Sequence, residues 1–252
     1  MELFIVSLAS LLAGFIDSIV GGGGLILVPA LFAVFPTAPP ATLFGTNKGA
    51  SVWGTAFATW QFSRRVEMRW AALLPAAGAG FVAAFAGAWL VTVVSPHFLR
   101  QLLPLILLAV LIYTLFKKDL GRTHAPRFSG GQETLVACAI GAGIGFYDGF
   151  FGPGTGSFLV FLFVRLLGYD FLSASASAKL INTTTNVASL ILFVIKGHVW
   201  WHFVVAMAVA NVVGSLLGTR LALKHGTGFV RVVFIGVVSA LILKTGYDAF
   251  LR

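Results

Sequence analysis

Charged residues are scarce in this sequence. Asp, Glu, Lys and Arg together make up only 10% of its 252 residues, whereas hydrophobic residues make up 58%. A soluble domain has about 25% charged residues. So few charged side chains exclude a sizeable soluble domain and predict a protein whose surroundings are the lipid bilayer.

Cysteine and nucleotide-binding motifs are also scarce or absent. Cys138 is the single cysteine, which excludes an internal disulfide and a cysteine metal site. Neither GxxxxGKS nor GxxxxGKT occurs, so ATP-driven activity would need a partner protein. The net charge of +9 does not indicate nucleic-acid binding, because the basic residues lie in short loops between apolar segments. We expect no nucleic-acid partner, no metal ion and no cofactor.

Apolar stretches follow one another along the whole chain. Many approach the length of about 20 residues that a helix needs to cross a bilayer. They predict an all-α polytopic membrane protein with about eight transmembrane segments. The first stretch is expected to be retained as a helix, because no basic region of a signal peptide precedes it. The stretches cover residues 3–20, 42–62, 70–94, 102–116, 135–151, 180–195, 203–223 and 232–243.

The second half of the chain repeats the first at an offset of 131 residues, the difference between positions 17 and 148. Matches of rare residue types carry most weight in a chain this poor in them. The pairs include Asp17 with Asp148, Lys48 with Lys179, and Trp70 with Trp201. We therefore predict a first membrane repeat over residues 1–120, a polar linker over 121–132 and a second repeat over 133–252.

Loop charge predicts that the two repeats have opposite orientations. The loop 63–69 carries three arginines, whereas its equivalent, 196–202, carries one lysine. The next pair reverses the bias, with one arginine in 95–100 and two arginines and a lysine in 220–231. Because basic loops stay on the cytoplasmic side, this pattern predicts an inverted repeat with both termini outside.

Each repeat contains a glycine run next to one carboxylate inside an apolar segment. Residues 14–24 include Asp17, and residues 145–155 include Asp148. Broken backbone at membrane depth must be buried in protein or line a wet cavity. Breaks at corresponding positions in two halves indicate a transporter's binding site. We predict that each repeat starts with a helical hairpin bent at these glycines.

Polar residues follow each break at helical spacing. Lys48, Ser51 and Thr55 share one helical face, and their repeat equivalents, Lys179, Asn182 and Asn186, share another. Charges inside a membrane are costly and usually mark a pathway. The predicted anion-binding residues are Lys48, Lys179, Asn47, Ser51, Thr55, Asn182, Asn186, Gly22, Gly23, Gly154 and Thr155. Asp17 and Asp148 are predicted to couple transport to protons.

Other interpretations of these residues stay open. Asp17 with Lys48, and Asp148 with Lys179, could form purely structural ion pairs, and the sequence leaves open whether the Asp–Lys pairs form within a repeat or between the repeats. A passive anion channel is a second alternative. An intramembrane enzyme using Ser157 is a weaker one, because the repeat places Ile26 at the equivalent position and no set of oxyanion donors is evident.

Three motifs resemble those of the TauE/SafE (TSUP) family of membrane anion transporters. They are Asp17 to Val20 followed by four glycines, the run 45–48 (Gly-Thr-Asn-Lys), and the run 145–156. The resemblance covers nearly the whole chain. It implies a multi-pass protein of the bacterial cytoplasmic membrane, a secondary transporter for sulfite, thiosulfate or organosulfonate anions. It supports anion transport better than any one substrate, and it leaves transport direction and homo-oligomer formation open.

Overall fold

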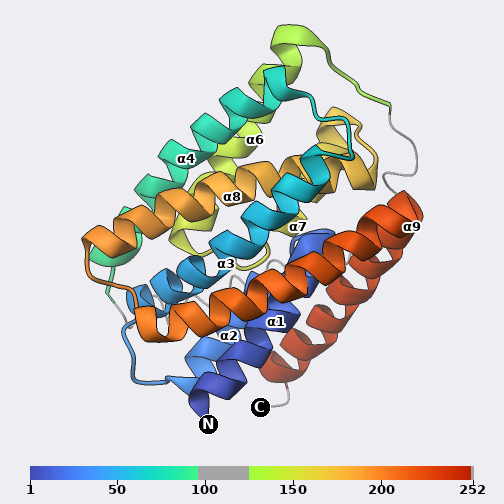
Figure 1. Ribbon diagram of the computed structural model, residues 1–252. Helices are drawn as coiled ribbons and strands as arrows, with labels where there is room; N and C mark the ends of the chain where they lie inside the picture. The colour runs from blue at the N-terminus through green and yellow to red at the C-terminus, as the bar shows by residue number, and fades with distance from the viewer. Residues whose placement is uncertain (96–124, 251–252) are drawn as a thin grey trace.

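The computed structural model describes residues 1–95 and 125–250. Within these ranges the chain is helical and contains no strand, which confirms the all-α expectation. The predicted segment 102–116 lies outside the described residues. The helices are α1 (Glu2–Val20), α2 (Gly24–Val34), α3 (Pro40–Ser63), α4 (Trp70–Val93), α6 (Gly130–Phe150), α7 (Thr155–Leu162), the short η1 (Phe163–Leu167), α8 (Phe171–Ile195) and α9 (Trp201–Phe250) (Figure 1).

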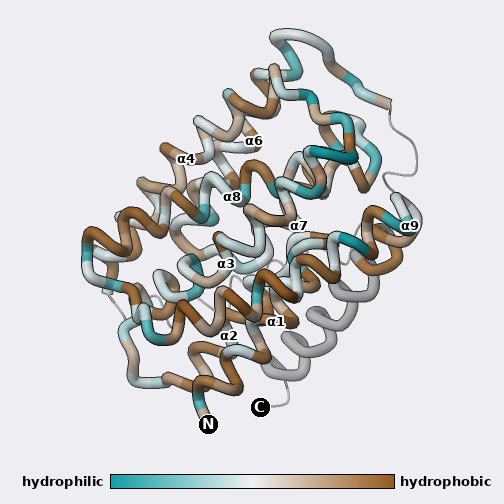
Figure 2. The backbone as a smooth tube through the Cα atoms, in the orientation of Figure 1, coloured by the Kyte–Doolittle hydropathy of each residue, from teal (hydrophilic) through white to brown (hydrophobic). Residues whose placement is uncertain are grey.

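Several of these helices suit a bilayer. By length and composition, α1, α4, α8 and residues 201–226 of α9 could each cross a membrane, while α2 and the α7–η1 segment are shorter apolar helices. Figure 2 shows hydrophobic residues along the helices and hydrophilic residues in the loops at the upper right. Val82, Val205 and Val209 are each more than 60% exposed. Outward apolar side chains of this kind fit contact with lipid rather than water. The total of eight spans stays a prediction.

The helices of the two halves begin at matching positions. α2 and α7 start at residues 24 and 155, α3 and α8 at 40 and 171, and α4 and α9 at 70 and 201. Each pair is separated by the 131-residue offset of the sequence repeat. In Figure 1, α3 and α8 run in opposite directions across the molecule, and so do α4 and the first part of α9.

A kink divides α9 into two helices. Gly226 has φ 70° and ψ −161°, a conformation outside the helical region. A positive φ is available to glycine because it has no Cβ. The chain after Gly226 returns toward the end of the molecule that holds the N-terminus (Figure 1).

Glycines bring helices of different halves into backbone contact. α4 packs on α6, and α1 packs on α9. A Cβ on Gly149 of α6 would collide with the carbonyl oxygen of Ala84 on α4, and a Cβ on Gly14 of α1 would collide with that of Asn211 on α9. Small residues permit this approach, which is a common means of helix association in lipid. The fourth helix of each half therefore packs against the first helix of the other half.

A polar cluster fixes the α4–α6 pair at one end. The buried Glu133 carboxylate lies 2.7 Å from Arg69 Nε, and the Tyr169 hydroxyl donates to it at 2.6 Å. Burial and the Glu133 carboxylate raise the pKa of the Tyr169 phenol, so this group stays protonated and keeps its hydrogen bond. The cluster ties the start of α4 to the start of α6 and to the turn before α8.

We expect Gly149→Ala to destabilise the protein by about 1–3 kcal/mol, because backbone atoms of α4 cannot yield to the added methyl group. Gly143→Ala on the same helix is the matched control, since nothing lies within 4 Å of the added Cβ. Thermal unfolding of the purified variants in detergent measures the difference. Equal stability of the two variants would contradict the close packing of α4 on α6.

Candidate functional site

Two helix breaks meet at the centre of the molecule. The first break, residues 21–23, separates α1 from α2, and the second break, residues 151–154, separates α6 from α7. Gly21, Gly152 and Gly154 have φ values of 80°, 91° and 85°, which glycine adopts without strain. The Ser157 N–H donates to Gly21 O at 2.9 Å, so the two breaks are hydrogen-bonded to each other.

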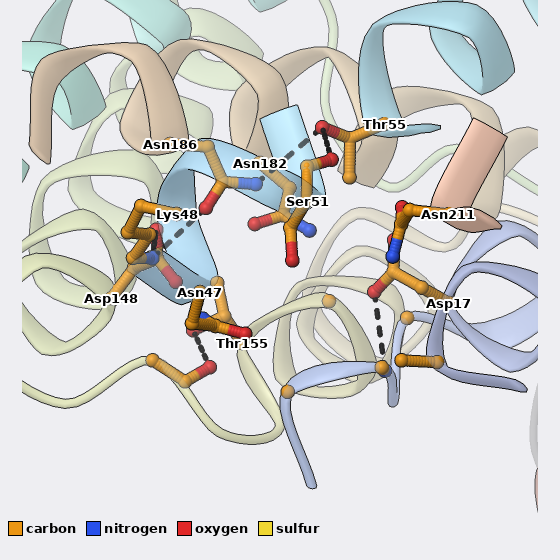
Figure 3. Close-up of a pocket in the computed structure, with 16 residues that line it drawn as sticks. Asp17, Asn47, Lys48, Ser51, Thr55, Asp148, Thr155, Asn182, Asn186 and Asn211 are labelled. Carbon is orange, nitrogen blue, oxygen red and sulfur yellow. Dashed lines mark hydrogen bonds and ion pairs between the residues drawn. The ribbon is translucent and has the colours of Figure 1, made fainter. Parts of the chain in front are cut away.

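A small polar cavity lies where the breaks meet (Figure 3). The centre of a water molecule can move within about 20 Å³ of it. Its walls come from both breaks and from the helices α1, α2, α3, α6, α7, α8 and α9. The lining residues are Ala13, Asp17, Gly21, Gly23, Gly24, Asn47, Lys48, Ser51, Thr55, Asp148, Gly152, Thr155, Gly156, Asn182, Asn186 and Asn211.

Lys48 is buried in the cavity wall and is paired with the other half of the chain. Its Nζ lies 2.6 Å from Asp148 Oδ2 and donates to Asn186 Oδ1 at 3.0 Å. The Asn186 amide in turn donates to Thr55 Oγ1 at 3.5 Å. These contacts, drawn in Figure 3, compensate a charge that would otherwise be costly to bury.

Lys179 is also buried and also pairs across the halves. Its Nζ lies 3.2 Å from Asp17 Oδ2 and donates to the backbone carbonyl of Asp17. The ammonium thus satisfies a carbonyl in the last turn of α1, a favourable place for a cation. The alternative in which Asp17 pairs with Lys48 and Asp148 with Lys179 is therefore wrong, because the structure exchanges the partners.

The structure brings most of the predicted site residues to this one cavity. Those that line it are Asp17, Gly23, Asn47, Lys48, Ser51, Thr55, Asp148, Thr155, Asn182 and Asn186. Gly22, Gly154 and Lys179 do not line it. Lys179 lies behind Asp17 instead, where it holds the carboxylate in position. The functional roles of all these residues stay predictions.

Asn211 lines the cavity although it was not among the predicted site residues. Its Nδ2 donates to Ser10 O at 2.9 Å, which fixes the amide against α1. The signal in the sequence is an amide inside the apolar stretch 203–223, where a buried amide between helices can pack or contact a bound molecule. The cavity lining also includes four glycines that were not predicted individually, Gly21, Gly24, Gly152 and Gly156; the first three belong to the runs 14–24 and 145–155, and Gly156 directly follows the second run.

The positive and negative charges of the site are equal in number. At least one buried polar atom of the described residues, Asn47 Oδ1, has no hydrogen-bond partner. Two lysines face two carboxylates, so an anion can gain a lysine only when a carboxylate gives it up or takes a proton. Asn47 is 5% exposed, and its Oδ1 has no hydrogen-bond partner among the described residues. A buried polar atom without a partner is costly unless water or a bound molecule satisfies it. This arrangement can exchange an internal ion pair for an external ligand.

Comparison with known proteins identifies the family of this chain. The family described as "Sulfite exporter TauE/SafE" matches residues 6–245. The chain belongs to the TauE/SafE family. No solved structure matches it.

Curated relatives of this TauE/SafE protein carry transporter names. "Probable membrane transporter protein YfcA" of Escherichia coli K12 is 38% identical over 240 residues, covering 95% of this chain and 88% of its own length. "Probable membrane transporter protein ORF9" of Sinorhizobium sp is 35% identical, with 94% and 89% covered. A "Probable membrane transporter protein" of Haemophilus influenzae is 34% identical, with 94% and 91% covered. Together with the apolar helices, these findings indicate a multi-pass membrane transporter rather than an enzyme.

The exchanged ion pairs give a stability prediction for this site. Lys48→Met should lower the free energy of unfolding by about 3–5 kcal/mol, because it leaves the Asp148 carboxylate buried without its partner. Adding Asp148→Asn should restore most of the loss, whereas adding Asp17→Asn should not. Thermal unfolding in detergent measures the three variants. Rescue by Asp17→Asn in place of Asp148→Asn would mean that the pairing in solution differs.

Proposed function

We propose that the protein is a secondary transporter that moves small sulfur-containing anions, of the sulfite, thiosulfate or organosulfonate type, across the cell membrane. The observation that carries this proposal is the buried cavity between two helix breaks, with Lys48 in its wall. The family description as a sulfite exporter supports the sulfur-containing class.

An anion would find several donors in this cavity. Lys48 supplies positive charge, and the N-terminus of α7 supplies the positive end of a helix dipole beside Thr155. The amides of Asn182 and Asn186 add neutral donors. We propose that the anion takes the place of the Asp148 carboxylate at Lys48.

The cavity must widen before it can bind such an anion. Room of about 20 Å³ for the centre of a water molecule suffices for roughly one or two waters. This conformation is then a closed one, in which the Asp148 carboxylate occupies the place at Lys48 that the anion would take. A carrier that opens to admit its cargo fits this geometry.

The distribution of charge supports the inverted orientation. Exposed basic residues gather at the end of the molecule where α3 ends and α4 begins, the upper right of Figure 1. The segments at this end are the turn after α3, the residues before α6, η1 and the part of α9 just before Gly226, and their exposed basic residues are Arg64, Arg65, Arg127, Arg165 and Lys224. Under the positive-inside rule this end faces the cytoplasm, so both termini lie outside. The opposite directions of α3 and α8 support two inverted repeats.

Removing the cavity lysine should impair anion transport more than removing a lysine on the surface. Lys48→Ala should lower the rate of sulfite and thiosulfate uptake about 10- to 100-fold, the equivalent of one hydrogen bond to a charged group. Lys48→Arg should keep part of the rate, and Lys224→Ala, on the surface, is the control. Uptake of radiolabelled anions into proteoliposomes provides the measurement. Wild-type flux in Lys48→Ala would end the anion-site proposal, and flux that neither saturates nor exchanges would indicate a channel.

Proton coupling gives a second transport prediction. If Asp148 must be protonated to release Lys48, a proton gradient should accelerate wild-type uptake, and Asp148→Asn should remove that dependence. Asp17→Asn tests the other pair in the same way. Proteoliposomes with and without an imposed pH gradient supply the comparison. Should wild-type flux ignore the gradient while both variants stay active, protons are not the coupling ion.

A further inference from the structure

The described helices sort into two packed units that differ from the two halves of the sequence. Unit 1 contains α1, α2, α3 and residues 201–226 of α9, and unit 2 contains α4, α6, α7, η1 and α8. α4 belongs to the first half of the sequence but packs with the second, and α9 does the reverse (Figure 1).

Contacts inside each unit are made backbone to backbone. In unit 2, a Cβ on Gly145 of α6 would collide with Gly80 of α4. In unit 1, a Cβ on Gly214 of α9 would collide with the carbonyl oxygen of Leu11 on α1, and Ser215 Oγ donates to Gly54 O of α3 at 2.6 Å. Close-packed backbones leave little room for sliding, so each unit is expected to move as one body.

Apart from the backbone contact of Gly21 with Gly156 where the two breaks meet, the interface between the units is different in kind. Along α3 and α8 it is held by polar side chains, such as Thr59 and Thr183, whose hydroxyl oxygens lie 2.9 Å apart. Both buried ion pairs cross it, because Lys48 and Asp17 belong to unit 1 whereas their partners belong to unit 2. The cavity lies in this interface (Figure 3).

Two apolar clusters continue the interface beyond the cavity, and the repeat relates them. Each draws side chains from both units. The first includes Val28, Phe151 and Phe193, and the second includes Leu159, Val20 and Phe62, the same positions shifted by 131 residues. Because both clusters are packed in this structure, each forms a seal that a relative movement of the units would open.

We infer that transport moves unit 1 against unit 2 along the α3–α8 interface, with α4 carried by the second half and α9 by the first. The two ion pairs hold the units together across the moving interface and must break before the units move. The two apolar seals open alternately. This inference rests on the proposed transport function and specifies which parts of the chain move together.

Disulfide cross-links from α3 test this division in a Cys138→Ala background. Thr59→Cys with Thr183→Cys joins the two units. Gly49→Cys with Val204→Cys is the matched control inside unit 1, because a Cβ on Gly49 would lie 2.9 Å from Val204 Cγ2. Both cross-links join the first half of the sequence to the second, so only the unit assignment distinguishes them.

Oxidation to the disulfide should abolish uptake by the first variant and spare the second, and reduction should restore the first. Full uptake by completely cross-linked Thr59→Cys/Thr183→Cys would overturn the inference. So would equal loss in both variants.

A measurement without transport separates this inference from the proposed function. Pulsed electron spin resonance between labels at Trp60 on α3 and Arg165 on η1, one in each unit, should show a second distance population when sulfite or acidic pH is applied to protein in liposomes. Labels at Trp60 and Lys224, both in unit 1, should keep one population. Change in both pairs, or in neither, would overturn the division even if uptake is observed. If the two units move relative to each other but no anion is taken up, the proposed function is contradicted and the division into two units is kept.

Discussion

The structure depends on one constraint: charged side chains and interrupted helix backbone that lie away from water must find partners within the protein. Two lysines, Asp148 and the two helix breaks are buried in the described bundle, Asp17 is 15% exposed, and many side chains on the outside of the helices are apolar. Each unpaired group would cost several kcal/mol. The bundle meets this constraint by placing Asp148 against Lys48 and Asp17 against Lys179, so that neither half can satisfy its own charges.

Glycine serves this constraint in two ways. At Gly21 and Gly152 it provides the positive φ that ends a helix and turns the chain. At Gly149 and Gly14 it is helical and permits backbones to touch. The first use creates the polar gap, and the second fixes the helices around it. A larger side chain at either kind of position would separate elements that must meet for the ion pairs to form.

The cavity is less symmetric than the repeat that builds it. Asn47 corresponds to Ala178, and Asn211 corresponds to Gly80, so the amides at these positions have no counterparts in the other half. The lysines also differ, since Lys48 lines the cavity whereas Lys179 holds the end of α1. The sequence repeat therefore supplies the framework, and departures from it supply the distinctive chemistry of the cavity.

Composition and spacing determined a good deal of this molecule in advance. Scarce charge and repeated apolar stretches fixed the membrane class, since lipid tolerates few other patterns. The offset of 131 residues located the breaks and the lysine-led stripes, because helical spacing gathers side chains on one face. Most of the residues predicted from these patterns line the one cavity.

The tertiary structure alone decided which faces meet. Periodicity says that Lys48 and Thr55 share a face, but it does not say that Asn186 and Asp148 lie opposite. Nor does it reveal that α4 packs with the second half, or that Asn211 reaches the cavity. These outcomes depend on the distances at which backbones pack, set by glycines such as Gly14 and Gly149 on helices remote in sequence. The sequence by itself determined what must be buried, and close packing decided against which partner.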